Sequence, residues 1–337
     1  MAFPAFSVFR GRGNAAAPLL LRESGGVSHL KENKTGEKSL KQFATAMRAS
    51  GLSPERLRLH VGQLPAVKVV RIASLDFHER PDSQRFHYLK RRMSLDGYLR
   101  NPPIVARDGA NGSPLVIDGV NRIEALRQLG VLDVLVQEVD IGDNDLTLST
   151  WHHIVEGLEP AELVREVSKS AEVTACEPLF TPDGDYVPQF YDGGACAIVL
   201  PDRRCYVVCS PRTLDGRIEA MSRVVEVLKS GTTRDRVSYT NMADLSRNYS
   251  NLCALVCYKG YSKTEVLEYA RRGRRFPSGV TRFTIPKRAL SLCVPLTLLR
   301  DRDSLERKQA RVDMLIENKI KQRKIRFYGE PTFHFDE

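Results

Sequence analysis

Between residues 67 and 139, short apolar runs alternate with stretches that have the periodicity of an amphipathic helix. Four runs have the length and β-branched content of strands: 67–72, 102–107, 114–118 and 134–139. Two stretches between them have helical periodicity: 85–95 and 121–130. In the first of these, Phe86, Leu89 and Met93 fall on one face. Strands that alternate with helices favour an α/β domain, which we place at residues 66–145.

After this region the pattern favours a second, mixed α+β domain, which we place at residues 146–299. Its predicted elements are a helix from Ala161, a β-hairpin at 194–210, a helix at 214–229, a strand at 252–258, a helix after 262, and strands within 279–285 and at 289–294. Ser262 and Glu265 form a capping box, which sets the start of the helix that Gly273 ends. The predicted fold class is therefore α/β with α+β character.

The two ends of the chain are basic. A helix is predicted from Pro295 to about Arg326, so residues 300–337 would form a C-terminal helical arm. Residues 1–60 hold ten Lys and Arg against four Asp and Glu, and residues 300–326 hold ten against five. The net charge of the whole chain is +10, so the body between the ends is close to neutral. Basic ends attract nucleic acid or acidic surfaces, although most charge runs are solvated helix faces.

Residues 1–65 are predicted to be an N-terminal extension, disordered at 1–29 and helical at about 38–50 and 54–61. Serine is scarce near the start, which argues against an organellar transit peptide. No apolar run approaches the roughly 18 residues of a membrane span. The seven cysteines are an odd number without a CxxC pair, so we interpret them as core residues in a reducing compartment and expect a cytoplasmic protein.

The segment 115–126, LVIDGVNRIEAL, places polar residues where a buried strand passes into a helix. A helix begins here with its N–H groups exposed, and these favour an anion. Gly119 allows close approach of a ligand, Arg122 suits phosphate oxygens, and Asp118 suits Mg²⁺. The alternative is local: Asp118 caps the helix, Gly119 forms the turn and Arg122 is solvated. The residue types alone leave both interpretations open.

The segment 116–130 resembles the DGxHR element of the ParB/sulfiredoxin-like fold. Four further segments occur in the same order as in the free L-serine kinases of this superfamily: 75–79 (LDFHE), 149–153 (STWHH), 276–283 (FPSGVTRF) and 290–299 (LSLCVPLTLL). These kinases are the SbnI/SerK-like group, known from staphyloferrin B-type siderophore clusters and from archaeal cysteine synthesis. The resemblance extends over roughly residues 67–300.

The resemblance implies phosphorylation of free L-serine to O-phospho-L-serine by ATP or ADP with Mg²⁺. The product would supply a cysteine, 2,3-diaminopropionate or siderophore pathway, with an enzyme that uses pyridoxal phosphate (PLP) downstream. Glu79 would be the general base. Asp118 would be catalytic and hold Mg²⁺. The nucleotide would be bound by Asp118, Gly119, Val120, Asn121 and Arg122. The substrate would be bound by His78, Glu79, Trp151, His153, Thr281 and Arg282, the last as the anchor for the carboxylate of serine.

The chain departs from the family at Asn121, where the family motif has histidine. Asparagine can donate a hydrogen bond to a phosphate oxygen, but it carries no charge. A sensor that binds both ligands without turnover is therefore one alternative. A ParB-like nucleotide-binding regulator or DNA-binding protein is another. No helix-turn-helix signature follows the first domain, which disfavours DNA binding. The sequence leaves open the oligomeric state and the choice between ATP and ADP.

Overall fold

The computed structural model describes residues 64–109, 112–190, 193–229 and 233–326. All of them fall within one unit of the chain, residues 58–337. The helices predicted at 38–50 and 54–61, and nearly all of the predicted N-terminal extension, lie outside the described residues. Within the described ranges, no helix has the length and apolar character needed to cross a membrane.

The predicted α/β region forms a five-stranded sheet with the order β1-β6-β4-β5-β2. Its strands are β1 (Val67–Arg71), β2 (Asp76–Phe77), β4 (Ile104–Arg107), β5 (Leu115–Asp118) and β6 (Asp133–Asp140). Strand β2 pairs with β5 in parallel, as β4 does with β6, and the other pairs are antiparallel. Because parallel strands end at the same edge of a sheet, the residues that follow β2 and β5 lie at one edge. This edge carries the candidate site.

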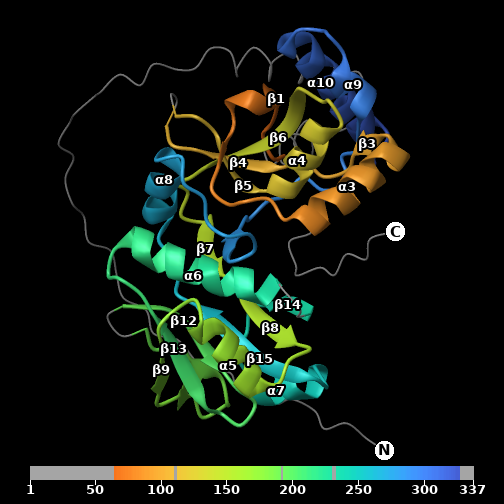
Figure 1. The fold of residues 1–337 in the computed structure, drawn as a ribbon. Helices are drawn as coiled ribbons and strands as arrows, with labels where there is room; N and C mark the ends of the chain where they lie inside the picture. Colours follow the sequence, from red (N-terminus) through yellow and green to blue (C-terminus); the bar gives the residue numbers. More distant parts are fainter. Residues whose placement is uncertain (1–63, 110–111, 191–192, 230–232, 327–337) are drawn as a thin grey trace, which may run out of the picture. The chain divides into compact units, whose positions relative to one another are not determined.

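Two helices next to this sheet begin close to that edge. Helices α3 (Ser83–Asp96) and α4 (Val120–Gln128) lie side by side in Figure 1. Asp82 caps α3 by accepting a hydrogen bond from the backbone of Arg85, and Gly97 in the left-handed region ends it. Helix α4 packs its buried side chains, among them Ile123 and Leu126, into the core formed with β4, β5 and β6.

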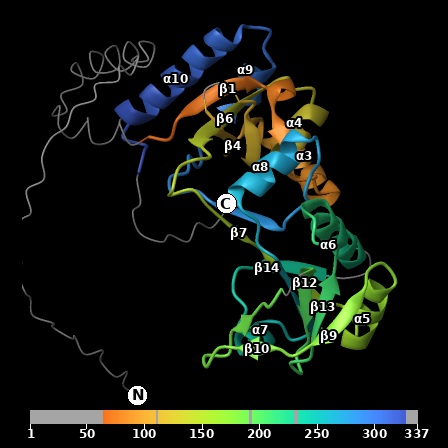
Figure 2. The same cartoon turned by 90° about the vertical axis from the view of Figure 1, so that its left-hand side faces the viewer.

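The second sheet is antiparallel and has the order β14-β8-β15-β12-β13-β9. Its strands are β8 (His152–Glu156), β9 (Val173–Cys176), β12 (Gly194–Val199), β13 (Cys205–Cys209), β14 (Thr233–Val237) and β15 (Leu252–Tyr258). Figure 2 shows α5 (Pro160–Ser168) and α6 (Leu214–Lys229) on one face, and α7 (Met242–Asn248) on the other. The predicted hairpin is confirmed as β12 and β13, and the predicted helix 214–229 is confirmed as α6.

The remaining strands of the described ranges form three short pairs. They are β3 (Tyr98–Leu99) with β17 (Val294–Pro295), β7 (Thr147–Thr150) with β16 (Thr281–Thr284), and β10 (Leu179–Phe180) with β11 (Tyr186–Val187). The capping box of Ser262 and Glu265 is present at the start of α8 (Lys263–Arg271). One apolar core runs from β4 and β5 through Phe276 and Val280 to α6 and the second sheet. The two sheets therefore share buried residues.

The predictions at the C-terminal end were partly wrong. Of the expected strand 289–294, only Val294 lies in a strand, β17. Ser291 and Cys293 have φ values of 52° and 54°, which do not occur in a regular strand. The expected single helix from Pro295 to about Arg326 is two helices, α9 (Leu296–Arg300) and α10 (Leu305–Lys321). Ser304 caps the second helix by accepting a hydrogen bond from the backbone of Arg307, which starts a new helix after a break.

Candidate active site at the end of strand β5

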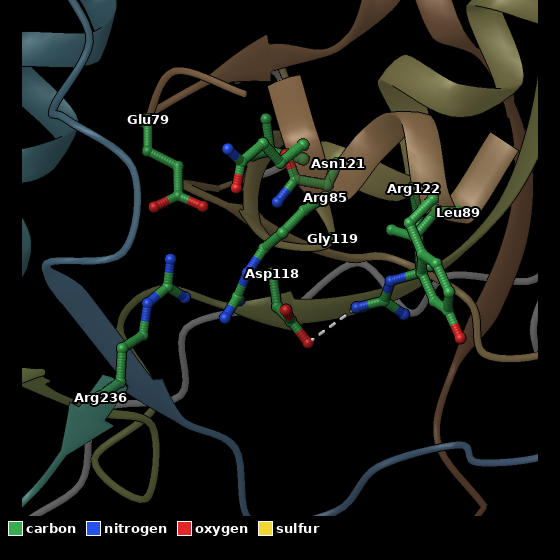
Figure 3. Close-up of a pocket in the computed structure, with 11 residues that line it drawn as sticks. Glu79, Arg85, Leu89, Asp118, Gly119, Asn121, Arg122 and Arg236 are labelled. Atoms are coloured by element: carbon green, nitrogen blue, oxygen red, sulfur yellow. Dashed lines mark ion pairs between the residues drawn. The ribbon is translucent and has the colours of Figure 1, made fainter. Parts of the chain in front are cut away.

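A cavity of about 520 Å³ lies at the end of β5. It is lined by Glu79, Gln84, Arg85, Tyr88, Leu89, Asp118, Gly119, Val120, Asn121, Arg122 and Arg236. Figure 3 shows how the labelled side chains surround it. All five residues predicted to bind the nucleotide line this cavity, and so does the predicted base, Glu79.

The turn between β5 and α4 is built around Gly119. This residue has a φ of 97° and stands at the N-cap of α4, where no side chain caps the helix. A Cβ atom here would lie 2.9 Å from Nη2 of Arg122, closer than real side chains approach. Only glycine therefore fits both the backbone conformation and the space. The uncapped first turn of α4 presents N–H groups of the kind that bind anions.

Asp118 is held between two arginines. Its Oδ2 lies 3.0 Å from Nη2 of Arg122 and also contacts Arg288. Burial opposes ionisation, but the charges of Arg122 and Arg288 outweigh it and hold the pKa of the Asp118 carboxyl below its ordinary value. Arg122 also donates to the carbonyl oxygens of Asn101 and Pro102, at 2.9 and 3.1 Å. The guanidinium of Arg122 is thus used largely in fixing the turn.

Asn121 connects the starts of α3 and α4. Its Oδ1 accepts a hydrogen bond from the backbone N–H of Asp82 at 2.7 Å. The amide oxygen is therefore engaged within the protein, and the neutral NH₂ group is the part of the side chain left for a ligand. Asn121 lines the cavity as predicted for the nucleotide site, without bringing a charge to it.

Glu79 follows β2 and is fixed by a loop that is distant in sequence. Its backbone forms an isolated parallel bridge with Phe276. Its Oε2 accepts a hydrogen bond from the backbone N–H of Gly279 at 3.1 Å. The half-buried carboxylate faces the cavity, opposite the turn that follows Asp118 (Figure 3). A carboxylate held by one backbone donor can still accept a proton from a bound hydroxyl.

His78 and Thr281 form a buried link behind the cavity. Nδ1 of His78 lies 2.6 Å from the carbonyl oxygen of Val116, and its Nε2 lies 2.8 Å from the hydroxyl of Thr281. Both side chains are buried and neither lines the cavity. This pair fixes the loop that carries Glu79 against β5 and β16.

The remaining predicted substrate residues do not line the cavity either. His153 is buried between the carbonyl oxygen of Gly279 and the hydroxyl of Tyr258, at 3.0 and 2.8 Å. The guanidinium of Arg282 lies over the ring of Trp151, 4.7 Å from its centroid. Arg282 and Thr281 are neighbours on a strand, so their side chains point to opposite faces and do not meet at one ligand.

Arg85 of α3 was a less certain functional candidate from the sequence, whereas the other cavity residues contributed by α3 and β14 were not predicted. Residues Gln84, Arg85, Tyr88 and Leu89 come from the first turns of α3, and Arg236 comes from β14 in the second sheet. A signal existed for the α3 residues, because they follow Glu79 closely in the chain. No local signal pointed to Arg236, which reaches the cavity only through the pairing of β14 with β8.

No resident metal centre is evident in the described ranges, where no group of three or more His, Cys, Asp or Glu could hold an ion. Asp118 is the one carboxylate at the turn, and both of its arginine contacts use Oδ2. Oδ1 is therefore the oxygen with which this residue could hold a cation. Mg²⁺ is commonly bound by one or two carboxylates together with substrate phosphates, and the site fits this arrangement.

His152, next to the predicted pocket histidine, should make stability depend on pH. Its Nδ1 is buried without a hydrogen-bond partner among the described residues, and burial lowers its pKa to about 4 from 6.5. The unfolded chain therefore binds more protons between pH 6.5 and 4, and stability should fall as pH drops through that window. The wild type should lose roughly 3 kcal/mol of unfolding free energy through His152 between pH 6.5 and 4, and His152→Leu should not show this loss.

Urea unfolding at pH 7, 5.5 and 4 would measure this for the wild type and for His152→Leu. The two free energies of unfolding should converge or cross as pH falls. Parallel pH profiles for the two proteins would show that His152 is not the group responsible.

Comparisons with known proteins agree with the resemblance that the motifs indicated. No family model matches the chain. The ATP-dependent L-serine kinase SbnI of Staphylococcus aureus (strain NCTC 8325 / PS 47) is 27% identical over 246 residues, which are 71% of this chain and 86% of the relative. The ATP-dependent L-serine kinase of Desulfurococcus mucosus is 21% identical over 237 residues, which are 69% of this chain and 90% of the relative.

Solved structures show the same fold. SbnI with a C-terminal truncation, from Staphylococcus aureus, has a TM-score of 0.59 and 24% identity, and the match covers 77% of this chain and 99% of that one. A free serine kinase in complex with AMP has a TM-score of 0.58 and 18% identity, and the match covers 70% of this chain and 95% of that one. The predicted similarity to the SbnI/SerK-like kinases is thus confirmed in sequence and in mixed α/β fold.

Proposed function

We propose that this protein is a kinase that phosphorylates free L-serine to O-phospho-L-serine with ATP. The observation that carries the proposal is the placement of Glu79 and the whole Asp118–Arg122 turn around one cavity. Two relatives that are named ATP-dependent L-serine kinases align along about 70% of the chain, which supports the same activity here. Neither relative is named as a DNA-binding protein, so the alternative of a ParB-like regulator has no support.

The domain assignment belongs to the same proposal. Residues 66–145 would be the ParB/sulfiredoxin-like nucleotide-binding domain, and residues 146–299 would complete the serine site. The five-stranded sheet and the six-stranded sheet support this division, because each lies within one of the two ranges. Residues 300–337 would be the C-terminal arm, and residues 1–65 a separate extension.

The turn would hold the phosphates of the nucleotide. The backbone N–H groups of Gly119, Val120 and Asn121 lie at the positive end of α4, where polyphosphate is stabilised. Asp118 would hold a Mg²⁺ ion that the nucleotide carries, through Oδ1. When bound, that ion would neutralise phosphate charge. Arg122 would keep the turn and Asp118 in position by its contacts with Asn101 and Pro102.

Glu79 would accept the proton of the serine hydroxyl. The hydrogen bond from Gly279 fixes the direction of its carboxylate, which is a positioning contribution to catalysis. His78, His153 and Thr281 would act through the loop that carries Gly279, because each is buried and already hydrogen-bonded. They would position the site rather than contact serine.

Arg282 would still bind the carboxylate of serine. Its guanidinium now lies on the face of Trp151, and it would have to turn from that ring to reach a substrate in the cavity. Trp151 would then form a wall of the serine site. The backbone of Arg282 is held by the pairing of β16 with β7, in which Arg282 lies opposite Ser149.

The product suggests the cellular setting. O-phosphoserine carries a good leaving group on its β-carbon, so a PLP enzyme that replaces this group is the kind of partner that would consume it. All seven cysteines are free, which supports action in a reducing compartment such as the cytoplasm.

Phosphorus NMR of the purified protein tests the proposal. With L-serine, Mg²⁺ and ATP we expect a new phosphomonoester resonance that is absent when serine is omitted. Repeating the reaction with ADP identifies the donor. If neither nucleotide gives the resonance although calorimetry shows that the nucleotide binds, the protein is a sensor rather than a kinase.

A further inference from the structure

Two arginines enter the cavity from separate parts of the fold. Arg85 comes from the first turn of α3, and Arg236 comes from β14. Figure 3 shows both guanidinium groups directed into the space between Glu79 and Asp118. Asp118 already contacts Arg122 and Arg288. Two further guanidinium groups directed into the same space therefore favour an added anionic group, such as a phosphate, at this point.

Arg236 is fitted closely to the loop that holds Glu79. A Cβ atom on Gly279 would lie 2.0 Å from Nη2 of Arg236, so the guanidinium occupies the place of a side chain at residue 279. Gly279 has a φ of 78° and donates its N–H to Glu79. The glycine thus brings the proposed base and the guanidinium of Arg236 to the same side of the cavity.

Arg85 is available for a ligand. Among the described residues its side chain makes no ion pair or hydrogen bond, whereas Arg122 is engaged by Asp118 and two carbonyl oxygens. Asn121 contributes only a neutral amide, and its oxygen is bound to Asp82. Beside the Mg²⁺ ion and the N–H groups of α4, further positive charge for phosphoryl transfer would therefore come from side chains elsewhere in the cavity.

We propose that Arg85 and Arg236 form a clamp on the phosphoryl group while it passes from nucleotide to serine, an inference that rests on the proposed kinase function. The serine Oγ forms a bond to the γ-phosphorus while Glu79 takes the hydroxyl proton. The bond from the γ-phosphorus to the bridging oxygen breaks, and its electron pair leaves with the nucleoside diphosphate. The two guanidinium groups neutralise the three peripheral oxygens, where charge is concentrated in the transition state.

This role predicts a loss in kcat rather than in substrate binding. Arg85→Gln and Arg236→Gln should each lower kcat by about 10²-fold, as removal of one donor to a transition-state charge does. The KM for serine and the Kd for ADP should change by no more than about threefold. Arg236→Lys keeps a charge near Gly279 and should recover part of kcat, but not all, because lysine lacks the planar fork.

The experiment combines steady-state kinetics with binding of a transition-state mimic. Calorimetry would compare ADP alone with ADP, aluminium fluoride, Mg²⁺ and serine. The glutamine variants should bind ADP normally and lose the extra affinity for the mimic. Arg91→Gln, an exposed change on the same helix, is the matched control and should resemble the wild type. Thermal unfolding checks that each variant folds, and Arg236→Lys carries the test if Arg236→Gln does not.

The outcomes separate this inference from the function on which it rests. If the wild type forms no O-phosphoserine, the proposed function fails. If the wild type is active and either glutamine variant keeps its kcat, the clamp is wrong. If the variants raise only the KM for serine, the arginines bind the carboxylate of serine instead, which also overturns the clamp.

Discussion

Glu79→Gln should lower kcat for O-phosphoserine formation by about 10²- to 10⁴-fold, the usual contribution of a general base. Glutamine has the shape of glutamate and keeps an oxygen that can accept the hydrogen bond from Gly279. The loop between Phe276 and Gly279 should therefore stay in place. The amide oxygen cannot take the serine proton, so the loss should appear in turnover and not in folding.

The measurement is the initial rate of O-phosphoserine formation at saturating ATP and serine, together with the Kd for ADP. Glu124→Gln is the matched control, because it makes the same change on α4 at a residue that does not line the cavity. We expect this control to have wild-type rates. Should Glu79→Gln retain kcat within about threefold of the wild type, Glu79 is not the base and another group must remove the proton.

Local signals in the sequence predicted the turn between β5 and α4 well. The apolar run before Asp118, the glycine at 119 and the helical periodicity after it are all within a dozen residues, and the structure has each of them. The hairpin of β12 and β13 and the capping box of α8 are equally local and were confirmed. Such features depend on neighbours along the chain, so a single sequence contains them.

The other half of the site depends on contacts between distant residues. Arg236 reaches Gly279 because β14 pairs with β8 and because Phe276, three residues before Gly279, pairs with Glu79. Nothing in the local sequence of β14 indicates this. One feature could have been anticipated: both Thr281 and Arg282 were predicted to bind serine, but adjacent residues of a strand face opposite ways, so the two side chains do not flank one ligand. The family resemblance gave their proposed roles without their geometry.

The break between α9 and α10 shows how a local signal can be outweighed. The region after Pro295 is rich in helix-forming residues, which favoured one continuous helix. Ser304 is a good N-cap, however, and Asp301 and Asp303 bind Arg311 from the turn before it. The second helix is then free to change direction and pack on β1, as Figure 2 shows.

The attachment of α10 should depend strongly on one buried ion pair. Nζ of Lys308 lies 2.5 Å from Oδ2 of Asp133 and 2.9 Å from the carbonyl oxygen of Leu299. The two charged side chains are only 1% and 3% exposed. Lys308→Met keeps the apolar part of the side chain but removes its charge. The buried carboxylate of Asp133 is then paired only with Arg71, which lies 3.6 Å away and has a largely exposed side chain. We expect the free energy of unfolding to fall by about 3–5 kcal/mol.

Urea unfolding of the wild type and Lys308→Met measures this loss. Lys321→Met is the matched control, because Lys321 pairs with Glu317 on the exposed side of the same helix at 3.8 Å. Surface pairs of this kind contribute about 0–1 kcal/mol, so the control should unfold nearly as the wild type does. A loss below about 1 kcal/mol in Lys308→Met would show that water or Arg71 compensates for the missing charge.

A double variant separates the cost of an unpaired charge from the cost of lost packing. Lys308→Met combined with Asp133→Leu removes both charges, and replacing a buried pair by apolar side chains is often neutral or stabilising. We expect the double variant to regain most of the stability that Lys308→Met loses. If the double variant stays as unstable as the single variant, Lys308 stabilises the protein through its packing and its hydrogen bond to Leu299. Neutralising the charge of Asp133 would then not be the source of the stability.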